Sequence, residues 1–89
     1  MPPAGRYSIN FARSARRELE RLPVRIAEVV LGHIEALQAD PRPPGVKKIH
    51  GADDLWRLRV GDYRVIYTID DTARLVDVSA IRDRKDAYR

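Results

Sequence analysis

The residues of this sequence that could do chemistry are mainly arginines in its second half. Arg57 and Arg59 are separated by one residue, Arg64 follows a short turn, and Arg82 comes near the C-terminus. A guanidinium is permanently charged, and its planar fork of donors meets phosphate oxygens two at a time. We therefore expect these four side chains to form an anion-binding surface, provided that the fold brings them to one face. The alternative is that Arg57 and Arg59 are only the solvated positions of a half-exposed strand.

Tyr88 supplies the group that the arginines lack, which is a proton acceptor. Placed beside fixed positive charge, its phenol would lie in a field that favours the phenolate, as a general base requires. RNA carries its own nucleophile in the 2′-hydroxyl, so a base and cations around the reacting phosphate would be sufficient for cleavage without a metal. A tyrosine near a chain end is also often a packing residue.

The sequence pattern predicts the elements that must position these residues, in the order β-α-α-β-β-β. Alternating apolar residues indicate a strand over 7–11, and helical spacing indicates a short helix over 15–22, which Pro23 ends. A second helix is expected from Pro23 to about residue 37, followed by a stiff connection over 41–45. Period-2 segments predict strands over 55–60, 63–69 and 75–81, with Gly61-Asp62 as a two-residue hairpin turn and 70–73 as the next turn.

The apolar residues of the second predicted helix form one stripe, which comprises Ile26, Val29, Val30, Ile34 and Leu37. This stripe needs a sheet face to cover, because a small sheet with one apolar side cannot leave that side in water. Trp56, Tyr63 and Tyr67 fall on the strand face that the helices should cover, so we assign them to the core. The predicted fold is α+β, with a helical hairpin packed on a small, mainly antiparallel sheet.

Length and composition set limits on what this protein is. Its 89 residues make one domain, 1–89, and no apolar run approaches the roughly 20 residues that a membrane span needs. A net charge of +4 suits an anionic partner without proving one. The absence of cysteine and the presence of only His33 and His50 argue against a metal site or another cofactor. The N-terminus lacks the features of a secretory signal, so we expect a cytoplasmic protein.

The second half of the chain resembles RelE toxins. The resemblance rests on Lys48-Ile49-His50-Gly51, on Leu55-Trp56-Arg57-Leu58-Arg59, on Gly61-Asp62-Tyr63-Arg64-Val65-Ile66-Tyr67, and on the segment from Arg82 to Tyr88. The Gly-x-Tyr-Arg-x-x-Tyr core is shared with ParE gyrase inhibitors and marks the RelE/ParE superfamily, whereas the basic pair, Arg82 and Tyr88 are RelE-like features. The resemblance implies a toxin of a type II toxin–antitoxin system that cuts mRNA on the ribosome, with a cognate antitoxin as its partner.

The resemblance also implies roles for single residues. Arg57 and Arg59 stand at the basic pair near the scissile bond, Arg64 and Arg82 match catalytic arginines, and Tyr88 matches the C-terminal tyrosine. Lys47, Lys48, Arg84 and Lys85 become candidates for RNA contacts, while His50 is assigned a structural role. The basic pair is often Lys in relatives, and an Arg pair cannot readily take up a proton, so Tyr88 becomes the expected base and the general acid stays unassigned. Two alternatives remain: a ParE-like inhibitor of DNA gyrase, and a catalytically silent protein that only binds an antitoxin.

Overall fold

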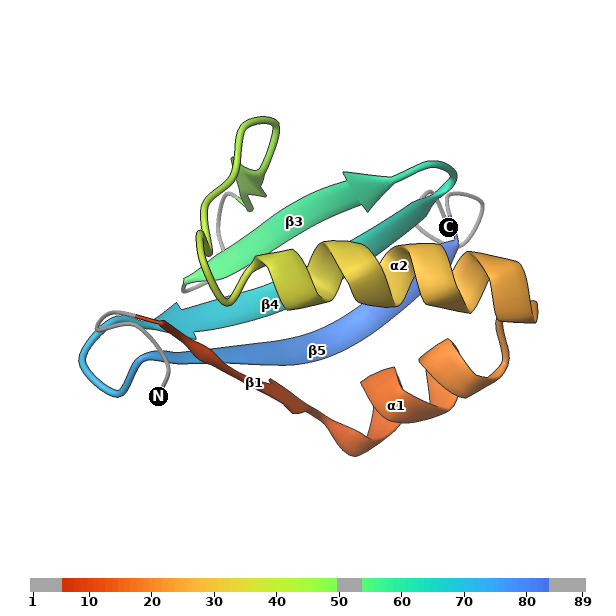
Figure 1. The fold of residues 1–89 in the computed structure, drawn as a ribbon, viewed down its shortest axis with the longest axis horizontal. Helices are drawn as coiled ribbons and strands as arrows, with labels where there is room; N and C mark the ends of the chain where they lie inside the picture. Colours follow the sequence, from red (N-terminus) through yellow and green to blue (C-terminus); the bar gives the residue numbers. More distant parts are fainter. Residues whose placement is uncertain (1–5, 50–53, 84–89) are drawn as a thin grey trace.

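The computed structural model describes residues 6–49 and 54–83, and these residues form two helices and one mixed sheet (Figure 1). The elements are β1 (Ser8–Phe11), α1 (Arg13–Glu20), α2 (Val24–Ala36), β2 (Lys47–Lys48), β3 (Leu55–Val60), β4 (Tyr63–Asp70) and β5 (Leu75–Asp83). The strand order is β1-β5-β4-β3-β2, and β1 pairs parallel to β5 while the other neighbours are antiparallel. The predicted α+β fold is thus confirmed, with the two-residue strand β2 as an addition.

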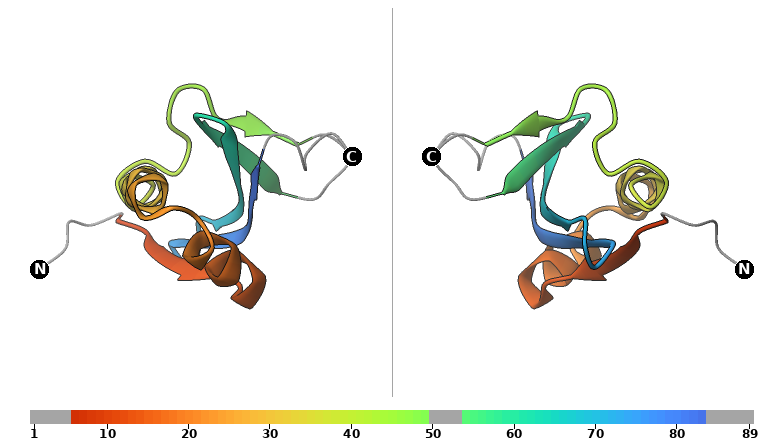
Figure 2. Two further views of the ribbon diagram at one scale, coloured as in Figure 1. Left: turned by 90° about the vertical axis from the view of Figure 1, so that its right-hand side faces the viewer. Right: turned by 90° about the vertical axis from the view of Figure 1, so that its left-hand side faces the viewer.

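Helix α2 lies over one face of the sheet, as both views in Figure 2 show. The core lies between this helix and the strands. Val30 and Ile34 of this helix and Leu37, directly after its last residue, are fully buried, as the apolar stripe predicted. The strands contribute the buried residues Leu58, Val60, Val65, Tyr67, Val76, Val78 and Ile81. Tyr67 is fully buried, and Trp56 and Tyr63 are partly buried against this core, which confirms their assignment. Burial of these side chains is the main force that holds the helical layer on the sheet.

Val29 departs from the predicted stripe. Its residue surface is 56% exposed, although the neighbouring Val30 is fully buried. Successive residues of a helix point about 100° apart, so a stripe read from spacing alone is wider than the face that meets the sheet. Val29 therefore lies at the border of the stripe and lines a groove that is described below.

The β3–β4 hairpin has the two-residue turn that the sequence predicted. Val60 pairs with Tyr63, and between them Gly61 has a φ of +58°, a backbone conformation that glycine adopts without steric cost. Because this turn sets the register, Arg59 lies directly opposite Arg64. The hairpin turn thus places two of the candidate site residues side by side.

Strand β5 contains an irregularity that changes which residues face the core. Ile66 pairs with Ala80 but Tyr67 pairs with Val78, so β5 carries one extra residue, Ser79, relative to β4. Such a β-bulge shifts the alternation of side chains by one position. Val78 and Ile81 consequently both face the core, although they are three residues apart.

A polar cluster closes the end of the sheet where β4 turns into β5. The Tyr7 hydroxyl donates a hydrogen bond to Asp71, and Arg42 donates two, at 3.2 and 2.9 Å. These bonds, chiefly those from Arg42, hold the pKa of Asp71 at about 2, whereas the bond to Asp71 raises the pKa of Tyr7. The cluster joins the start of β1, the connection after α2 and the β4–β5 turn. It lies at the opposite end of β4 from Arg64.

Replacing Tyr67 with Phe should destabilise the fold without changing its shape. The Tyr67 hydroxyl donates a 2.8 Å hydrogen bond to the carbonyl oxygen of Pro41, a buried contact that anchors the connection after α2. Tyr67→Phe leaves that carbonyl unsatisfied, which should lower the free energy of unfolding by about 1 to 3 kcal/mol in urea titrations. Tyr63→Phe is the control, because Tyr63 is a partly buried tyrosine on the same face of the sheet. It should change the free energy of unfolding by less than half as much.

No helix within the described ranges, 6–49 and 54–83, is long and apolar enough to cross a membrane.

Candidate functional site

Three arginines form one row across three neighbouring strands. Arg59 of β3 is paired with Arg64 of β4, and Arg64 is paired in turn with Arg82 of β5. Directly opposed residues of a sheet share a face, so this row lies on one face of the sheet. Leu58, Val65 and Ile81, one position away on each strand, are buried on the other face under α2. The arginine row therefore lies on the face that α2 leaves uncovered.

A second row brings further positive charge to the same face. Arg57, two residues before Arg59, is paired with Lys47 of β2 on one side and with Ile66 of β4 on the other. A pocket of about 270 Å³ lies here, lined by Gly45, Lys47, Arg57, Arg59 and Arg64. Arg82 extends this surface as the next residue in register beyond Arg64. Four of the five lining residues carry a positive charge, so the pocket is suited to an anion.

The two outer arginines of the row have identified partners. The Arg59 Nε donates to the carbonyl oxygen of Gly61 at 3.3 Å, which holds its side chain along the hairpin. The Arg82 Nε lies 3.4 Å from the Glu18 Oε2, an ion pair in which the Arg82 side chain remains 52% exposed. Like charges directly opposite each other destabilise a sheet. The row of arginines is therefore an arrangement that the packing of the sheet alone does not favour.

Of the lysines and arginines predicted to contact RNA, two lie in β2 on opposite faces of the sheet, and the others lie outside the described residues. Lys47 lines the cationic pocket, whereas Lys48 is paired with Trp56, and its ammonium lies 5.9 Å from the centroid of that ring. The Arg42 guanidinium lies 5.2 Å from the same ring. His50, Arg84, Lys85 and Tyr88 lie outside the described residues.

Glu18 is the residue at this site that the sequence did not indicate. It is an acidic residue between arginines on a short amphipathic helix, where a glutamate usually serves as a solvated surface residue. Its contacts with β5 depend on where α1 packs, and this information is absent from local spacing. Within the described ranges, no three His, Cys, Asp or Glu side chains are grouped closely enough to hold a metal ion.

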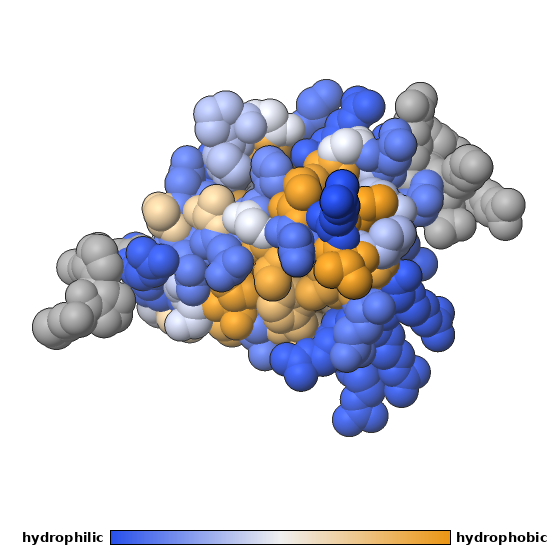
Figure 3. All heavy atoms as spheres, turned by 45° about the vertical axis from the view of Figure 1, so that its right-hand side comes forward, coloured by the Kyte–Doolittle hydropathy of each residue, from blue (hydrophilic) through white to orange (hydrophobic). Residues whose placement is uncertain are grey.

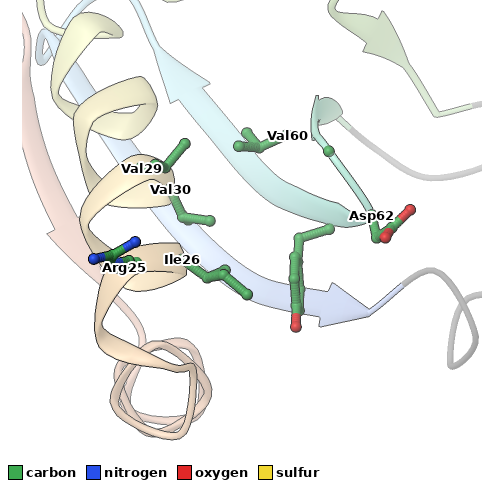
Figure 4. Close-up of a pocket in the computed structure, with 8 residues that line it drawn as sticks. Arg25, Ile26, Val29, Val30, Val60 and Asp62 are labelled. Carbon is green, nitrogen blue, oxygen red and sulfur yellow. The ribbon is translucent and has the colours of Figure 1, made fainter.

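An apolar groove lies on the other side of the sheet, between α2 and the β3–β4 hairpin. Figure 3 shows apolar side chains gathered on this part of the surface and bordered by hydrophilic ones. The groove has a volume of about 340 Å³, and Ile26, Val29, Val30, Val60 and Tyr63 form its apolar lining. Figure 4 shows side chains from the helix and from the strands facing one another across it, with Arg25 and Asp62 at its border. The molecule thus presents a cationic pocket on one face and an apolar groove on the other.

Comparisons with known proteins agree on one family. The family model described as "ParE toxin of type II toxin-antitoxin system, parDE" matches residues 9–88. The chain is 34% identical to Toxin RelG and 33% identical to Toxin RelE, both of Mycobacterium tuberculosis, over 93% of its length in each case. These alignments cover 97% and 87% of those relatives. Its fold is similar to a chain of the RelE–RelB complex of Pyrococcus horikoshii, with a TM-score of 0.78 and 28% sequence identity. This match covers 88% of the present chain and 94% of the Pyrococcus chain.

These matches run almost the whole length of the chain and agree with the strand order and the helical layer described above. The chain therefore belongs to the RelE/ParE superfamily and is a toxin of the type II toxin–antitoxin class.

Proposed function

We propose that this protein is a ribosome-dependent endoribonuclease that cleaves mRNA without a metal ion, in the cytoplasm. The observation that carries the proposal is the row of Arg59, Arg64 and Arg82 on the uncovered face, beside the pocket lined by Arg57 and Lys47. An RNA phosphate in this pocket would meet several guanidinium groups whose positions are set by the sheet. Preorganised charges of this kind stabilise the extra negative charge of a pentavalent transition state.

In this mechanism the RNA supplies the nucleophile. The ribose 2′-hydroxyl gives its proton to the base and attacks the adjacent phosphorus, while the bond from phosphorus to the 5′-oxygen of the next nucleotide breaks. The products are a 2′,3′-cyclic phosphate and a 5′-hydroxyl, the latter formed when the leaving oxygen takes up a proton. The arginines hold the phosphate in line and balance its charge. Arg84, Lys85 and Lys48 serve as further RNA-backbone contacts in this proposal, and the ribosome presents the message.

The positions of the other tyrosines support Tyr88 as the base. The Tyr7 hydroxyl is bonded to Asp71, and the Tyr67 hydroxyl is bonded to the Pro41 carbonyl in the core, where burial raises its pKa. Tyr63 faces the apolar groove, on the side away from the arginine row. Of the four tyrosines of the chain, the three that the structure describes are thus turned to the core side or to a carboxylate, which leaves Tyr88 as the candidate for the base.

We propose further that the cognate antitoxin docks in the apolar groove between α2 and the β3–β4 hairpin. The structural relative from Pyrococcus horikoshii is itself a RelE–RelB complex. The groove is lined by apolar side chains of which Val29 is 56% exposed, and such exposed apolar surface on a small protein is typical of an interaction site. An amphipathic helix of the antitoxin, with an acidic residue placed against Arg25, would fit it.

A Val29→Glu substitution should prevent neutralisation by the antitoxin and leave toxicity intact. A carboxylate buried at the centre of an apolar interface should cost at least about 2 kcal/mol of binding energy, or roughly a 30-fold rise in Kd by titration calorimetry. Val24→Glu is the matched control, because Val24 is 73% exposed on the same helix but does not line the groove. Equal loss of binding by the two variants, or none by Val29→Glu, would place the antitoxin elsewhere.

The competing function is inhibition of DNA gyrase, which the ParE description of the matching family favours. The deciding experiment adds the purified toxin to an in vitro translation reaction and maps message cleavage by primer extension, beside a gyrase supercoiling assay. The ribonuclease proposal expects new 5′ ends within the translated region and unchanged supercoiling. Uncut message with blocked supercoiling would establish the gyrase alternative, and inactivity in both assays would favour a silent antitoxin-binding protein.

A further inference from the structure

The position of Arg82 beside Arg64 depends on the bulge in β5. Val76 and Val78 face the core, so an uninterrupted strand would turn Arg82, another even-numbered residue, toward the core as well. The extra residue at Ser79 reverses this alternation. Ile81 becomes the core residue, and Arg82 comes to lie in register with Arg64 on the opposite face. A bulge of this kind leaves backbone groups that need partners from elsewhere in the fold.

Helix α1 provides these partners. Strand β1 ends at Phe11, and the amide of Ala12 makes the last bond on this edge, to the carbonyl oxygen of Val78 at 2.9 Å. Beyond this point α1 lies next to β5, as Figure 1 shows. The Ser14 hydroxyl donates to the carbonyl oxygen of Ser79 at 3.4 Å, and the backbone amide of Ile81 donates to the Glu18 Oε1 at 3.0 Å.

The same Glu18 carboxylate also binds the side chain of Arg82. Its Oε2 atom lies 3.4 Å from the Arg82 Nε, while Oε1 holds the amide of the preceding residue, Ile81. The Glu18 side chain is only 24% exposed, so its carboxylate is partly desolvated. The atoms that this ion pair joins are Oε2 and Nε, and Nε lies on a different edge of the guanidinium from the one formed by the two Nη groups. These Nη groups form the edge that can bind two phosphate oxygens.

We propose that Glu18 is a positioning residue for Arg82, an inference that rests on the proposed ribonuclease function. One carboxylate fixes the backbone at the bulge and the Nε edge of Arg82. The Nη edge is thereby held for the scissile phosphate, beside Arg64. Without Glu18 the arginine would sample several rotamers, and part of the binding energy would be spent on ordering it. Glu18 itself touches neither the RNA nor the reacting atoms.

The test uses Glu18→Gln, which retains an oxygen for the Ile81 amide but removes the charge that holds Arg82. Glu20→Gln, which removes a carboxylate from an exposed position of the same helix, is the control. We expect Glu18→Gln to lower the single-turnover rate of ribosome-bound mRNA cleavage roughly 10- to 100-fold, with ribosome binding within twofold of wild type. Glu20→Gln should cleave at the wild-type rate. Wild-type cleavage by Glu18→Gln would overturn the proposal.

A double variant separates positioning from a general structural role. If Glu18 acts through Arg82, adding Glu18→Gln to Arg82→Ala should cause no further loss of rate. A multiplicative loss in the double variant would show that Glu18 acts on the fold as a whole, and would contradict the inference.

The contact between Glu18 and Arg82 can also be measured in the free toxin, without any cleavage. This measurement tests the inference separately from the proposed function. In the ¹⁵N spectrum of the free toxin, the Arg82 Nε–H should exchange slowly with water in the wild type and in Glu20→Gln, and fast in Glu18→Gln. This result together with uncut message would reject the ribonuclease and retain the Glu18–Arg82 contact. Fast exchange of Arg82 Nε–H in the wild type would reject the positioning role whatever the activity.

Discussion

Arg82→Ala is expected to lower the rate of mRNA cleavage on the ribosome by roughly 10² to 10³, and to abolish growth arrest on induction. Loss of one preorganised donor to a charged transition state typically costs about 2.7 to 4 kcal/mol. Arg82 ends the row that starts at Arg59 and passes through Arg64. In the proposed mechanism its removal would leave one side of the phosphate without a cation. Single-turnover primer extension on programmed ribosomes measures this loss directly.

The fold should survive this substitution. The Arg82 side chain is 52% exposed, and ion pairs at such positions are typically worth less than about 1 kcal/mol. Circular dichroism and the urea midpoint should therefore stay close to wild type. Arg16→Ala, at an exposed position of α1, removes the same charge away from the row and should retain full cleavage. A fully active Arg82→Ala would remove Arg82 from the mechanism. If this variant also remained toxic while gyrase was inhibited, the ParE-like function would take the place of the ribonuclease.

Tyr88→Phe should cause a loss of roughly 10² to 10⁴ in cleavage rate, the range that a general base contributes. Phenylalanine keeps the aromatic ring and with it any stacking on an RNA base, so the substitution tests the hydroxyl alone. The arginines of the row cannot replace it, because a guanidinium stays protonated at the pH of the reaction. In the wild type the single-turnover rate should rise with pH as the phenolate fraction grows, and in Tyr88→Phe this rise should disappear.

Tyr63→Phe is the matched control for this experiment. It removes a phenol of the same kind from a residue that lines the apolar groove, on the face opposite the arginine row. Cleavage by this variant should equal that of the wild type. Full activity of Tyr88→Phe would instead limit Tyr88 to stacking or packing, and another group would have to accept the proton.

Local patterns in the sequence were sufficient for the two helices, for every strand except the two-residue β2, and for the relative placement of Arg57, Arg59 and Arg64. Period-2 alternation and the Gly61 turn determine the β3–β4 hairpin, since a two-residue turn permits one register. That register alone puts Arg59 opposite Arg64 and Arg57 on the same face. The burial of Val30, Ile34 and Leu37 likewise follows from helical spacing, because an apolar stripe must be covered.

The placement of Arg82 was decided by tertiary structure. We expected it beyond the end of a strand over 75–81, but β5 continues to Asp83 and Arg82 is a strand residue within it. A bulge leaves no reliable mark in the sequence, because it depends on pairing with β4 and on the partners that α1 supplies. The same holds for Glu18, whose charge is visible in the sequence while its contacts with Ile81 and Arg82 arise only when α1 packs against β5. The sequence by itself thus determined which residue types were available and which faces they took within the β3–β4 hairpin and along the buried side of α2. The packing of helix on strand, which joins residues about 60 positions apart, decided how Arg82 completes the row.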